Sequence, residues 1–385
     1  MIIEPKVRGF ICTTAHPVGC EESVKRQIDY VKQHDKKEGP KRILIIGAST
    51  GYGLASRIAT TFTYGAATLG VMYEKEATKS RTATPGFYNT EAFEAFAKSD
   101  GYYAKTINGD AFTKEIKEKT IQMIREELGK VDMVIYSLAA PRRTVGDVTY
   151  SSVLKPITHP FTNRTLDLRT NELSEVTIPA ATKEEIEATI QVMGGEDWKI
   201  WLQELKKAKV LEDGVITLAY SYVGPKITSP IYSEGTIGRA KQHLYQTSLE
   251  LKKELKDLHG RVYISVNKAL VTQASAAIPV VPLYISLLYR VMKKKGLHEG
   301  CIEQMDRLFS ERLVAKEVVT DDLGQIRMDD YELQEDVQEE IIKAWNNVSQ
   351  ENLKELADID GYWEDFYHMF GFYYDTIDYS KDIEL

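Results

Sequence analysis

The sequence predicts an α/β fold built on a parallel, doubly wound sheet with helices on both faces. Short apolar, β-branched runs alternate along the chain with runs whose apolar residues have helical spacing, and parallel strands need such crossovers. The first run, Ile43 to Ile46, leads through a glycine-rich turn into a helical pattern. With 385 residues, 43% of them hydrophobic, the chain can bury a sizeable core. A single enlarged domain is expected over residues 1–385, and two intimate domains are the alternative that the length leaves open.

Residues 1–40 are expected to form an N-terminal extension that packs on the main sheet. Val7 to Thr13 is a short strand candidate, and a helix is predicted from about Glu21 to His34. The start of the chain has no apolar core long enough for a signal peptide. The most apolar segment, residues 274–289, is interrupted by two prolines and is shorter than the ~20 residues that cross a bilayer. No membrane span is predicted.

Three cysteines, Cys12, Cys20 and Cys301, are too few and too scattered for a disulfide framework, which favours a reducing, cytoplasmic location. His16 lies between the first two, but no fourth ligand has zinc-like spacing, so no metal is predicted. The net charge of −8 is spread along the chain without a long basic run. This distribution argues against a nucleic-acid partner.

Residues 41–140 form the predicted nucleotide-binding half, which is organised around the segment R-I-L-I-I-G-A-S-T-G-Y-G-L. Gly47, Gly51 and Gly53 mark a tight turn between a buried strand and a helix. Such a turn gathers unpaired backbone N–H groups and the positive end of a helix dipole at one point, which suits a pyrophosphate. A glycine-rich turn without any ligand is the alternative.

Polar or small residues follow each of the next three predicted strands. The strand over residues 67–73 ends at Glu74, where a carboxylate would bind the adenosine ribose and repel a 2′-phosphate. Asp110 follows the strand over residues 102–107 and suits an adenine amino group, although an Asx turn or a helix cap is equally natural. Small residues, Ala139 and Ala140, follow the strand over residues 131–138. Because all these features fall at carboxyl ends of strands, a dinucleotide site is favoured over a solvated glutamate or close helix packing.

Residues 141–213 are predicted to be an insertion. Its first part, to Pro179, lacks regular periodicity, and a connection of this length is typical of a lid or substrate wall. Thr182 and Glu185 form a capping box for a helix that reaches about Met193. The phrase M-G-G-E-D-W that follows is explained by a C-capping glycine and a new acidic helix start. We assign it no chemistry at this stage.

Residues 214–295 form the predicted catalytic half. Tyr222, Tyr232 and Lys241 follow the strand over residues 214–220. A tyrosine suits hydrogen bonding or proton donation to a carbonyl oxygen, and a nearby lysine would bind a ribose and lower the pKa of the phenol. The nine-residue separation of Tyr232 and Lys241 would put them on opposite sides of one helix. Tyr232 must therefore precede a helix that starts at about Thr236, after Gly235.

The last part, residues 296–385, is predicted to be a helical cover. It holds helices near residues 299–313 and 333–345 and then an aromatic tail that includes Tyr362, Phe366, Phe370 and Phe372. Aromatic residues at this density usually seal a core. A separate binding module is not predicted here.

The combined motifs resemble the NADH-dependent trans-2-enoyl-CoA reductase family, which also contains a type of bacterial enoyl-acyl-carrier-protein reductase. They are the Tyr-x8-Lys spacing of Tyr232 and Lys241, the turn G-A-S-T-G-Y-G, the phrase V-M-G-G-E-D-W and the run L-V-T-Q-A-S-A-A-I-P-V-V-P-L-Y. The resemblance extends over essentially the whole chain. It implies a Rossmann-like sheet and an enzyme that reduces the double bond of trans-2-enoyl thioesters with NADH.

The resemblance also implies roles for individual residues. Tyr232 would be the catalytic proton donor, and Tyr222 would contact the substrate. No metal or flavin would be needed. NADH would be bound by Gly47, Ala48, Ser49, Thr50, Gly51, Tyr52, Tyr73, Glu74, Asp110, Ala111, Leu138, Ala139, Lys241, Leu270, Val271 and Thr272.

Two alternatives accompany this reading of the chain. The physiological substrate is either a short enoyl-CoA or an enoyl-acyl-carrier-protein, and an acidic carrier would need a basic rim such as Lys75, Arg81, Arg142 and Arg143. A dinucleotide-sensing protein without turnover is the non-enzymatic alternative, against which Tyr232 and Lys241 argue. A monomer is expected.

Overall fold

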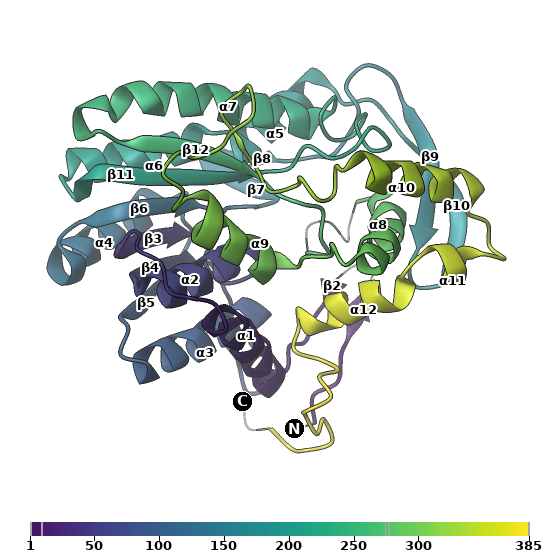
Figure 1. The fold of residues 1–385 in the computed structure, drawn as a ribbon, viewed down its shortest axis with the longest axis horizontal. Coiled ribbons are helices and arrows are strands. Elements are labelled where there is room, and N and C mark those ends of the chain that lie inside the picture. The colour runs from purple at the N-terminus through teal and green to yellow at the C-terminus, as the bar shows by residue number, and fades with distance from the viewer. Residues whose placement is uncertain (1, 9–10, 274, 276–277, 384–385) are drawn as a thin grey trace.

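The centre of the molecule is a parallel sheet (Figure 1). The computed structural model describes residues 2–8, 11–273, 275 and 278–383. Within them the order across the sheet is β13 (Ile326–Arg327), β12 (Arg261–Val266), β11 (Leu211–Ser221), β6 (Val131–Tyr136), β3 (Arg42–Ile46), β4 (Ala67–Met72) and β5 (Ala104–Asn108). The order reverses between β3 and β6, which confirms the predicted doubly wound, Rossmann-like sheet and places a ligand crevice at this switch point.

Helices cover both faces of the sheet, because successive residues of each strand point to opposite sides. In β3, Ile43 and Ile45 pack into one apolar cluster, whereas Leu44 and Ile46 pack into the other. The first cluster includes side chains of α2 (Gly51–Tyr64), α1 (Pro17–Lys32), α3 (Pro85–Ser99) and α9 (Cys301–Arg307). The second includes side chains of α4 (Lys114–Met123), α6 (Glu196–Lys207) and α7 (Thr236–Glu254).

Several of these helices continue into turns of different pitch. α4 runs into the π-helical turn η1 (Ile124–Leu128), and α9 runs into a second one, η4 (Leu308–Arg312). α7 is followed by the 3₁₀ turn η2 (Lys256–Leu258). The sequence pattern predicted a single helix in each case, and these irregular turns leave no signal in the apolar spacing.

A third apolar cluster lies beside the sheet and combines the insertion with the C-terminal part of the chain. It contains residues of the hairpin β9 (Phe161–Asp167) and β10 (Glu172–Ile178), of α8 (Val281–Lys295), α10 (Glu335–Asn347) and α12 (Ile359–His368), and Leu353 at the start of α11 (Leu353–Leu356). Figure 1 shows these elements gathered on one side of the molecule. Tyr232, Leu270 and Val271 belong to the same cluster, so it adjoins the predicted catalytic loop.

The insertion is more regular than the sequence predicted. Besides β9 and β10 it contains the hairpin β7 (Arg142–Val145) and β8 (Val148–Ser151) and the helix α5 (Lys183–Met193). The capping box of Thr182 and Glu185 is present at the start of α5. Both hairpins expose many polar side chains, which conceals the alternation that marks a half-buried strand.

The N-terminal extension differs in detail from its prediction. The single strand candidate over residues 7–13 is an antiparallel pair, β1 (Val7–Arg8) and β2 (Ile11–Cys12), and residues 9–10 lie outside the described part. α1 begins at Pro17, earlier than expected, because His16 caps it by accepting a hydrogen bond from Gly19 N–H at 3.2 Å.

Two further findings concern the described residues only. None of their helices combines the length and the apolar character that a membrane crossing requires. They also contain no group of three or more His, Cys, Asp or Glu side chains that could hold a metal ion. Residues 274, 276 and 277 of the apolar segment over residues 274–289 lie outside the described part.

Candidate active site

The glycine turn packs directly against the end of the neighbouring strand β6. Gly47 has a φ of +86°, and a Cβ there would overlap the carbonyl oxygen of Ser137. A Cβ on Gly53 would overlap the carbonyl oxygen of Gly47. The turn can therefore be this tight only because both residues lack a side chain. It brings the start of α2 to the switch point of the sheet.

The first turn of α2 has backbone N–H groups that are not used in capping. Its N-cap, Thr50, makes no side-chain capping bond, and the backbone bond from Leu54 N–H to Thr50 O spans 3.2 Å. The N–H groups of Gly51, Tyr52 and Gly53 precede that bond, and a helix leaves such groups without intrahelical acceptors. Together with the positive end of the helix dipole, they suit the negative charge of a pyrophosphate.

Glu74 lies beside this turn, at the carboxyl end of β4. Its Oε1 accepts a hydrogen bond from the Ser49 hydroxyl at 2.6 Å, and its backbone N–H donates to Asn108 at 2.9 Å. The carboxylate is thus held at the sheet edge, in a half-buried position, and is not an ordinary solvated glutamate. Tyr73 next to it is 78% exposed and offers an open aromatic face.

Asp110 and Ala111 form the turn after β5. Asp110 Oδ1 accepts a hydrogen bond from Phe112 N–H at 2.9 Å, which makes an Asx turn. The helix-cap alternative for Asp110 is wrong, because Thr113 is the N-cap of α4. Leu138, half-buried, and Ala139, exposed, follow β6 on the same edge of the sheet.

Lys241 lies where the Tyr-x8-Lys spacing requires. α7 begins at Thr236 after Gly235, so Tyr232 precedes the helix and Lys241 is in its second turn, as predicted. The ammonium of Lys241 donates to the carbonyl oxygen of Tyr220, near the end of β11, at 3.2 Å. Burial lowers the pKa of Lys241 to about 8.

The phenol of Tyr232 is buried, and its surroundings correct one expectation. A cation was expected to lower its pKa, but burial, Glu332 and Tyr362 raise the pKa of Tyr232 well above its usual value. Lys241 is not among the groups that shift it. Tyr232 therefore stays protonated at neutral pH in this structure. No hydrogen bond to its hydroxyl occurs among the described residues.

Tyr222 packs against Tyr232 but has a partner of its own. The two rings meet edge to face with their centroids 4.9 Å apart. The Tyr222 hydroxyl donates to Glu332 Oε1 at 3.3 Å, and Tyr284 donates to the same oxygen at 2.7 Å. Glu332 Oε2 accepts from the backbone N–H of Ala269 at 2.8 Å. Burial raises the pKa of Glu332. In its ionised form the carboxylate only accepts hydrogen bonds, and the Tyr222 hydroxyl then points its hydrogen towards Glu332.

Hydrogen bonds through Tyr289 connect the segment over residues 270–272 to the C-terminal cover. Val271 N–H donates to the Tyr289 hydroxyl at 3.2 Å, and Tyr289 donates to Asp365 at 2.7 Å. Leu270 and Val271 are buried and Thr272 is half-buried. The Tyr52 hydroxyl donates to the carbonyl oxygen of Lys268 at 2.8 Å, which links the glycine turn to this segment.

The structure adds two residues that the sequence did not single out for the site. Glu332 and Tyr362 both lie close enough to Tyr232 to raise the pKa of its phenol. The aromatic tail was expected to seal a core, and it does: Tyr362, Phe366 and Phe370 are buried. The sequence pattern does not indicate a role for Glu332, because this residue follows a two-residue strand and its partner Tyr222 lies 110 residues away in the chain.

Arg143 is a correction to the proposed basic rim. Its guanidinium is buried and donates to Glu196 at 2.7 Å and to the carbonyl oxygen of Gln191 at 2.8 Å. It is therefore not available to an acidic carrier. Lys75, Arg81 and Arg142 remain exposed.

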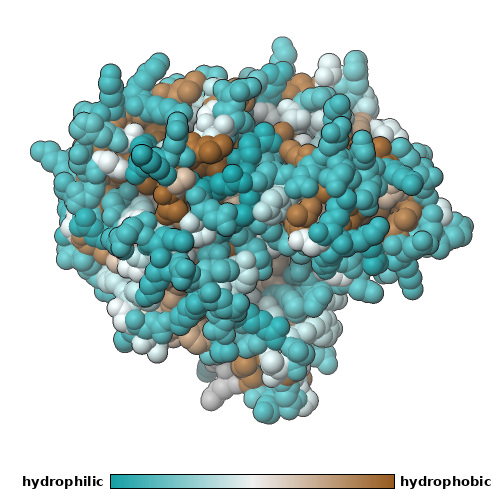
Figure 2. Space-filling model, in the orientation of Figure 1, coloured by the Kyte–Doolittle hydropathy of each residue, from teal (hydrophilic) through white to brown (hydrophobic). Residues whose placement is uncertain are grey.

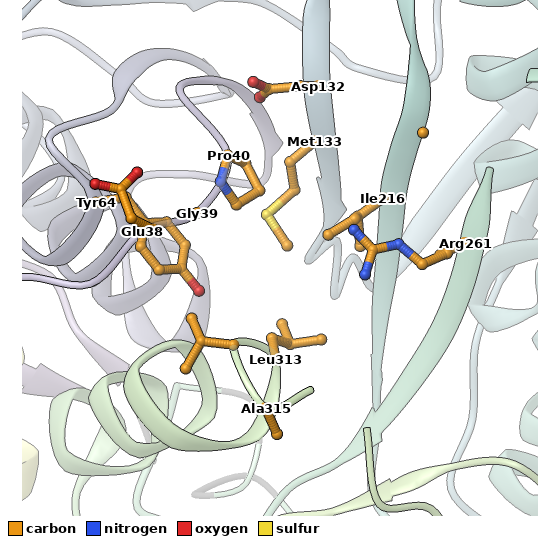
Figure 3. A pocket seen from close by; sticks show the side chains of 12 residues that line it. Glu38, Gly39, Pro40, Tyr64, Asp132, Met133, Ile216, Arg261, Leu313 and Ala315 are labelled. Atoms are coloured by element: carbon orange, nitrogen blue, oxygen red, sulfur yellow. The ribbon is translucent and has the colours of Figure 1, made fainter. Parts of the chain in front are cut away.

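A hollow of about 330 Å³ lies at the opposite end of the sheet (Figure 3). Asp132 and Met133 near the amino end of β6, and Arg261 at the amino end of β12, line it. The Asp132 carboxylate already accepts hydrogen bonds from the backbone N–H groups of Lys41 and Arg42, at 2.8 and 2.9 Å. This hollow is thus separate from the predicted site residues, which follow the carboxyl ends of the strands.

Comparisons with known families agree with this geometry. Three family models match consecutive parts of the chain: the NAD(P)H binding domain of trans-2-enoyl-CoA reductase over residues 2–79, the trans-2-enoyl-CoA reductase catalytic region over residues 81–314, and the enoyl reductase FAD binding domain over residues 320–383.

Relatives match over their full lengths. The chain is 54% identical to the trans-2-enoyl-CoA reductase (NADH) of Ruminiclostridium cellulolyticum, over 100% of this chain and 98% of the relative. It is also 54% identical to the enoyl-acyl-carrier-protein reductase (NADH) of Flavobacterium johnsoniae, over 99% and 97%. The solved structure of Clostridium acetobutulicum trans-2-enoyl-CoA reductase in complex with NADH superposes with a TM-score of 0.97 at 46% identity, covering 100% of this chain and 98% of that one. The Treponema denticola enzyme in complex with NAD gives a TM-score of 0.96 at 47% identity, with the same coverage.

Proposed function

Because this chain belongs to the trans-2-enoyl-CoA reductase family, we propose that it reduces the trans-2 double bond of short enoyl-CoA thioesters, such as crotonyl-CoA, with NADH. The observation that carries the mechanism is the pair of facing tyrosines. The Tyr222 hydroxyl donates a hydrogen bond to Glu332 at 3.3 Å, while Tyr232 is buried, protonated and without a described partner. Tyr232 is therefore the donor that can meet a substrate oxygen.

The residues at the switch point fit the cofactor. The first turn of α2 would hold the pyrophosphate, and Glu74 would accept hydrogen bonds from the adenosine ribose. Lys241 would donate to the nicotinamide ribose, and Leu270 to Thr272 would flank the nicotinamide. When bound there, NADH supplies the hydride that adds to the β-carbon of the enoyl thioester.

Tyr232 acts on the charge that this addition produces. As the double bond is reduced, negative charge develops on the thioester oxygen and an enolate forms. Transfer of a proton to the α-carbon then converts the enolate into the saturated product. The protonated phenol of Tyr232 donates a hydrogen bond to that oxygen. A preorganised donor in a site that excludes water contributes mainly to the stability of the transition state. Tyr222 would contact the substrate as an acceptor or through its ring.

The described residues over 320–383 do not fit a flavin, although one family model is named for it. The aromatic side chains of this segment that could stack on an isoalloxazine are packed against one another and against α8. A Cβ on Gly361 would overlap Asp358, and one on Gly371 would meet the backbone of His16. The remaining glycine of the segment, Gly324, has a φ of +72° and room around it, but it is the only glycine of its turn. The segment therefore has no glycine-rich turn for a pyrophosphate, and we derive no step from a flavin.

The experiment that tests this function is NADH oxidation by the purified protein with crotonyl-CoA, followed as loss of NADH absorbance. Turnover is expected with the enoyl thioester and not with the saturated butyryl-CoA. Absence of turnover with any enoyl thioester would instead support a nucleotide sensor. Crotonyl-acyl-carrier-protein is the second substrate to assay, because relatives with equal identity bear both names.

The preferred carrier is identified by the ratio of kcat/KM with crotonyl-CoA to kcat/KM with crotonyl-acyl-carrier-protein. We favour CoA, because the burial of Arg143 removes one member of the basic rim. A kcat/KM that is higher with the carrier protein would reverse this assignment.

Three wider assignments are part of the proposal. We place the protein in the cytoplasm, which is supported by three free cysteines. We propose that it is a monomer. We also propose the division into an extension (1–40), a nucleotide-binding half (41–140), an insertion or lid (141–213), a catalytic half (214–295) and a C-terminal cover (296–385).

A further inference from the structure

The phrase M-G-G-E-D-W lies outside the reaction described above, yet one of its two acidic residues, Asp197, is buried. Asp197, in the first turn of α6, forms an ion pair with Lys117 of α4 at 2.8 Å. Only 2% of Asp197 and 3% of Lys117 are exposed. Each ion has thus been taken out of water, which requires nearly complete compensation by hydrogen bonds.

The ammonium of Lys117 has three donors, and the structure uses all of them. One goes to Asp197, and the other two go to the backbone carbonyls of Ala111 at 2.8 Å and Phe112 at 3.0 Å. These carbonyls belong to the turn after β5, which also contains Asp110. The cation therefore holds this turn from the side that faces the interior.

The rest of the cluster strengthens this hold. The second carboxylate oxygen of Asp197 accepts a hydrogen bond from the hydroxyl of Tyr136, the last residue of β6, at 3.1 Å. The neighbouring Glu196 pairs with buried Arg143, whose guanidinium lies 5.5 Å from the ring centroid of Phe112. Both acidic residues of the phrase thus hold a buried cation against the same turn.

Stability alone does not explain such a pair. Burial lowers the pKa of Lys117 and raises the pKa of Asp197, because it disfavours both charged forms. Replacement of a buried ion pair by apolar side chains of similar size is often neutral or even stabilising. Apolar side chains cannot, however, donate hydrogen bonds to the two carbonyls of the turn.

We propose that Asp197 and Lys117 are positioning residues for the adenosine half of NADH. Asp197 fixes the ammonium, and the ammonium fixes the turn of Asp110 and Ala111 at the spacing from Glu74 that the adenosine requires. The inference rests on the proposed function, specifically on the placement of the adenosine end at this turn.

The test compares the binding of two cofactors to the full-length protein. Reduced nicotinamide mononucleotide carries the nicotinamide ribose of NADH but has no adenosine. The variant combines Lys117→Met and Asp197→Leu with Tyr136→Phe, so that no buried hydroxyl loses its acceptor. Dissociation constants are measured from the fluorescence of the reduced nicotinamide. We expect the Kd of NADH to rise about tenfold, and the Kd of the mononucleotide to stay within about twofold.

Controls separate this effect from general damage. The half-buried pair of Arg42 on β3 and Glu212 on β11 lies at the opposite end of the sheet, at 2.8 Å. Arg42→Met with Glu212→Leu should leave both Kd values unchanged. If the triple variant does not fold, Asp197→Asn keeps the shape and one acceptor but removes the charge, and a smaller rise for NADH alone is expected.

Two results would overturn the inference. One is a rise of both Kd values by the same factor, which would show a general structural role, and the other is no rise in either. The variant Asp110→Ala tests separately whether the adenosine of NADH lies at this turn. If that variant binds NADH and the mononucleotide in the wild-type ratio, the adenosine does not lie at this turn, and the proposed cofactor site is wrong as well.

Discussion

Two tyrosine rings meet edge to face in the site, and the partners of their hydroxyls assign them different tasks. Tyr222 donates to Glu332, whereas Tyr232 has no described partner. We expect Tyr232→Phe to remove most turnover and leave the Kd of NADH nearly unchanged. Loss of one donor to a developing oxyanion raises the barrier by about 3 kcal/mol or more. The measurement is kcat with crotonyl-CoA beside NADH binding by fluorescence.

Tyr263→Phe is a suitable control, because Tyr263 lies on β12 outside the site. Near-normal turnover by Tyr232→Phe would move the donor role to Tyr222.

Glu332 determines the direction of the Tyr222 proton. Glu332→Gln keeps the shape but replaces one acceptor oxygen by an NH₂ donor, so either the Ala269 N–H or the hydroxyls of Tyr222 and Tyr284 lose their acceptor. We expect kcat to fall about tenfold, the equivalent of one hydrogen bond. If Glu332 acts through Tyr222, the same substitution should have little further effect in a Tyr222→Phe background, because coupled residues are not additive. Full additivity would mean that the two residues act separately.

Lys241 gives the site a dependence on pH. Burial lowers its pKa to about 8, so in the free protein the ammonium is present below that pH and is lost above it. Because the charged form is the better donor to the nicotinamide ribose, we expect NADH affinity to weaken as pH rises from about 7 to about 9.5. Lys241→Met should bind NADH weakly at every pH and turn over slowly even at saturating cofactor.

A fluorescence titration across this range tests the assignment. A variant with normal affinity and normal turnover would show that Lys241 has no part in the site. Burial also lowers the pKa of Lys268 to about 8. Lys268 would therefore explain any pH dependence of NADH affinity that remains in the variant Lys241→Met.

At the scale of single elements, we expect the end of β4 to select NADH over NADPH. Glu74 is held by Ser49 at 2.6 Å, close to where the adenosine ribose would lie. A 2′-phosphate would meet this carboxylate in a half-buried position, and such a like-charge contact costs several kcal/mol. We expect a strong preference for NADH over NADPH in kcat/KM, and Glu74→Gln should reduce it. Equal efficiency of the wild type with both cofactors would refute the placement of Glu74.

The elements that the sequence predicted are those with a local signal. The turn of Gly47 to Gly53 and the helix start after Gly235 depend on neighbouring residues, so spacing alone locates them. The positions of Glu332 and Arg143 depend on partners far away in the chain, and their local sequence is that of an ordinary polar segment. For the same reason the phrase M-G-G-E-D-W indicated a C-capping glycine and an acidic helix start, which are both present, but not the buried pair of Asp197 and Lys117.

At the scale of the whole molecule, the surface supports a monomer. The exposed large apolar residues are dispersed over different elements, such as Ile11 on β2, Val148 on β8 and Ile342 on α10. On the face in Figure 2, hydrophobic residues form small patches between hydrophilic ones. Larger continuous patches are usual where proteins associate. We expect light scattering after gel filtration to give 43.6 kDa, and a mass that rises with concentration would contradict this.

The path of the chain through the C-terminal cover has a consequence for biosynthesis. A ribosome releases the amino-terminal part first, and folding starts there. The glycine turn, Glu74 and Lys241 all emerge before Glu332, which reaches back across 110 residues to Tyr222. β13, at the edge of the sheet, and Tyr362 also emerge late. A nascent chain therefore gains the elements that we propose to bind the dinucleotide early in translation, and it completes the surroundings of the proposed catalytic tyrosine only once this late segment has emerged.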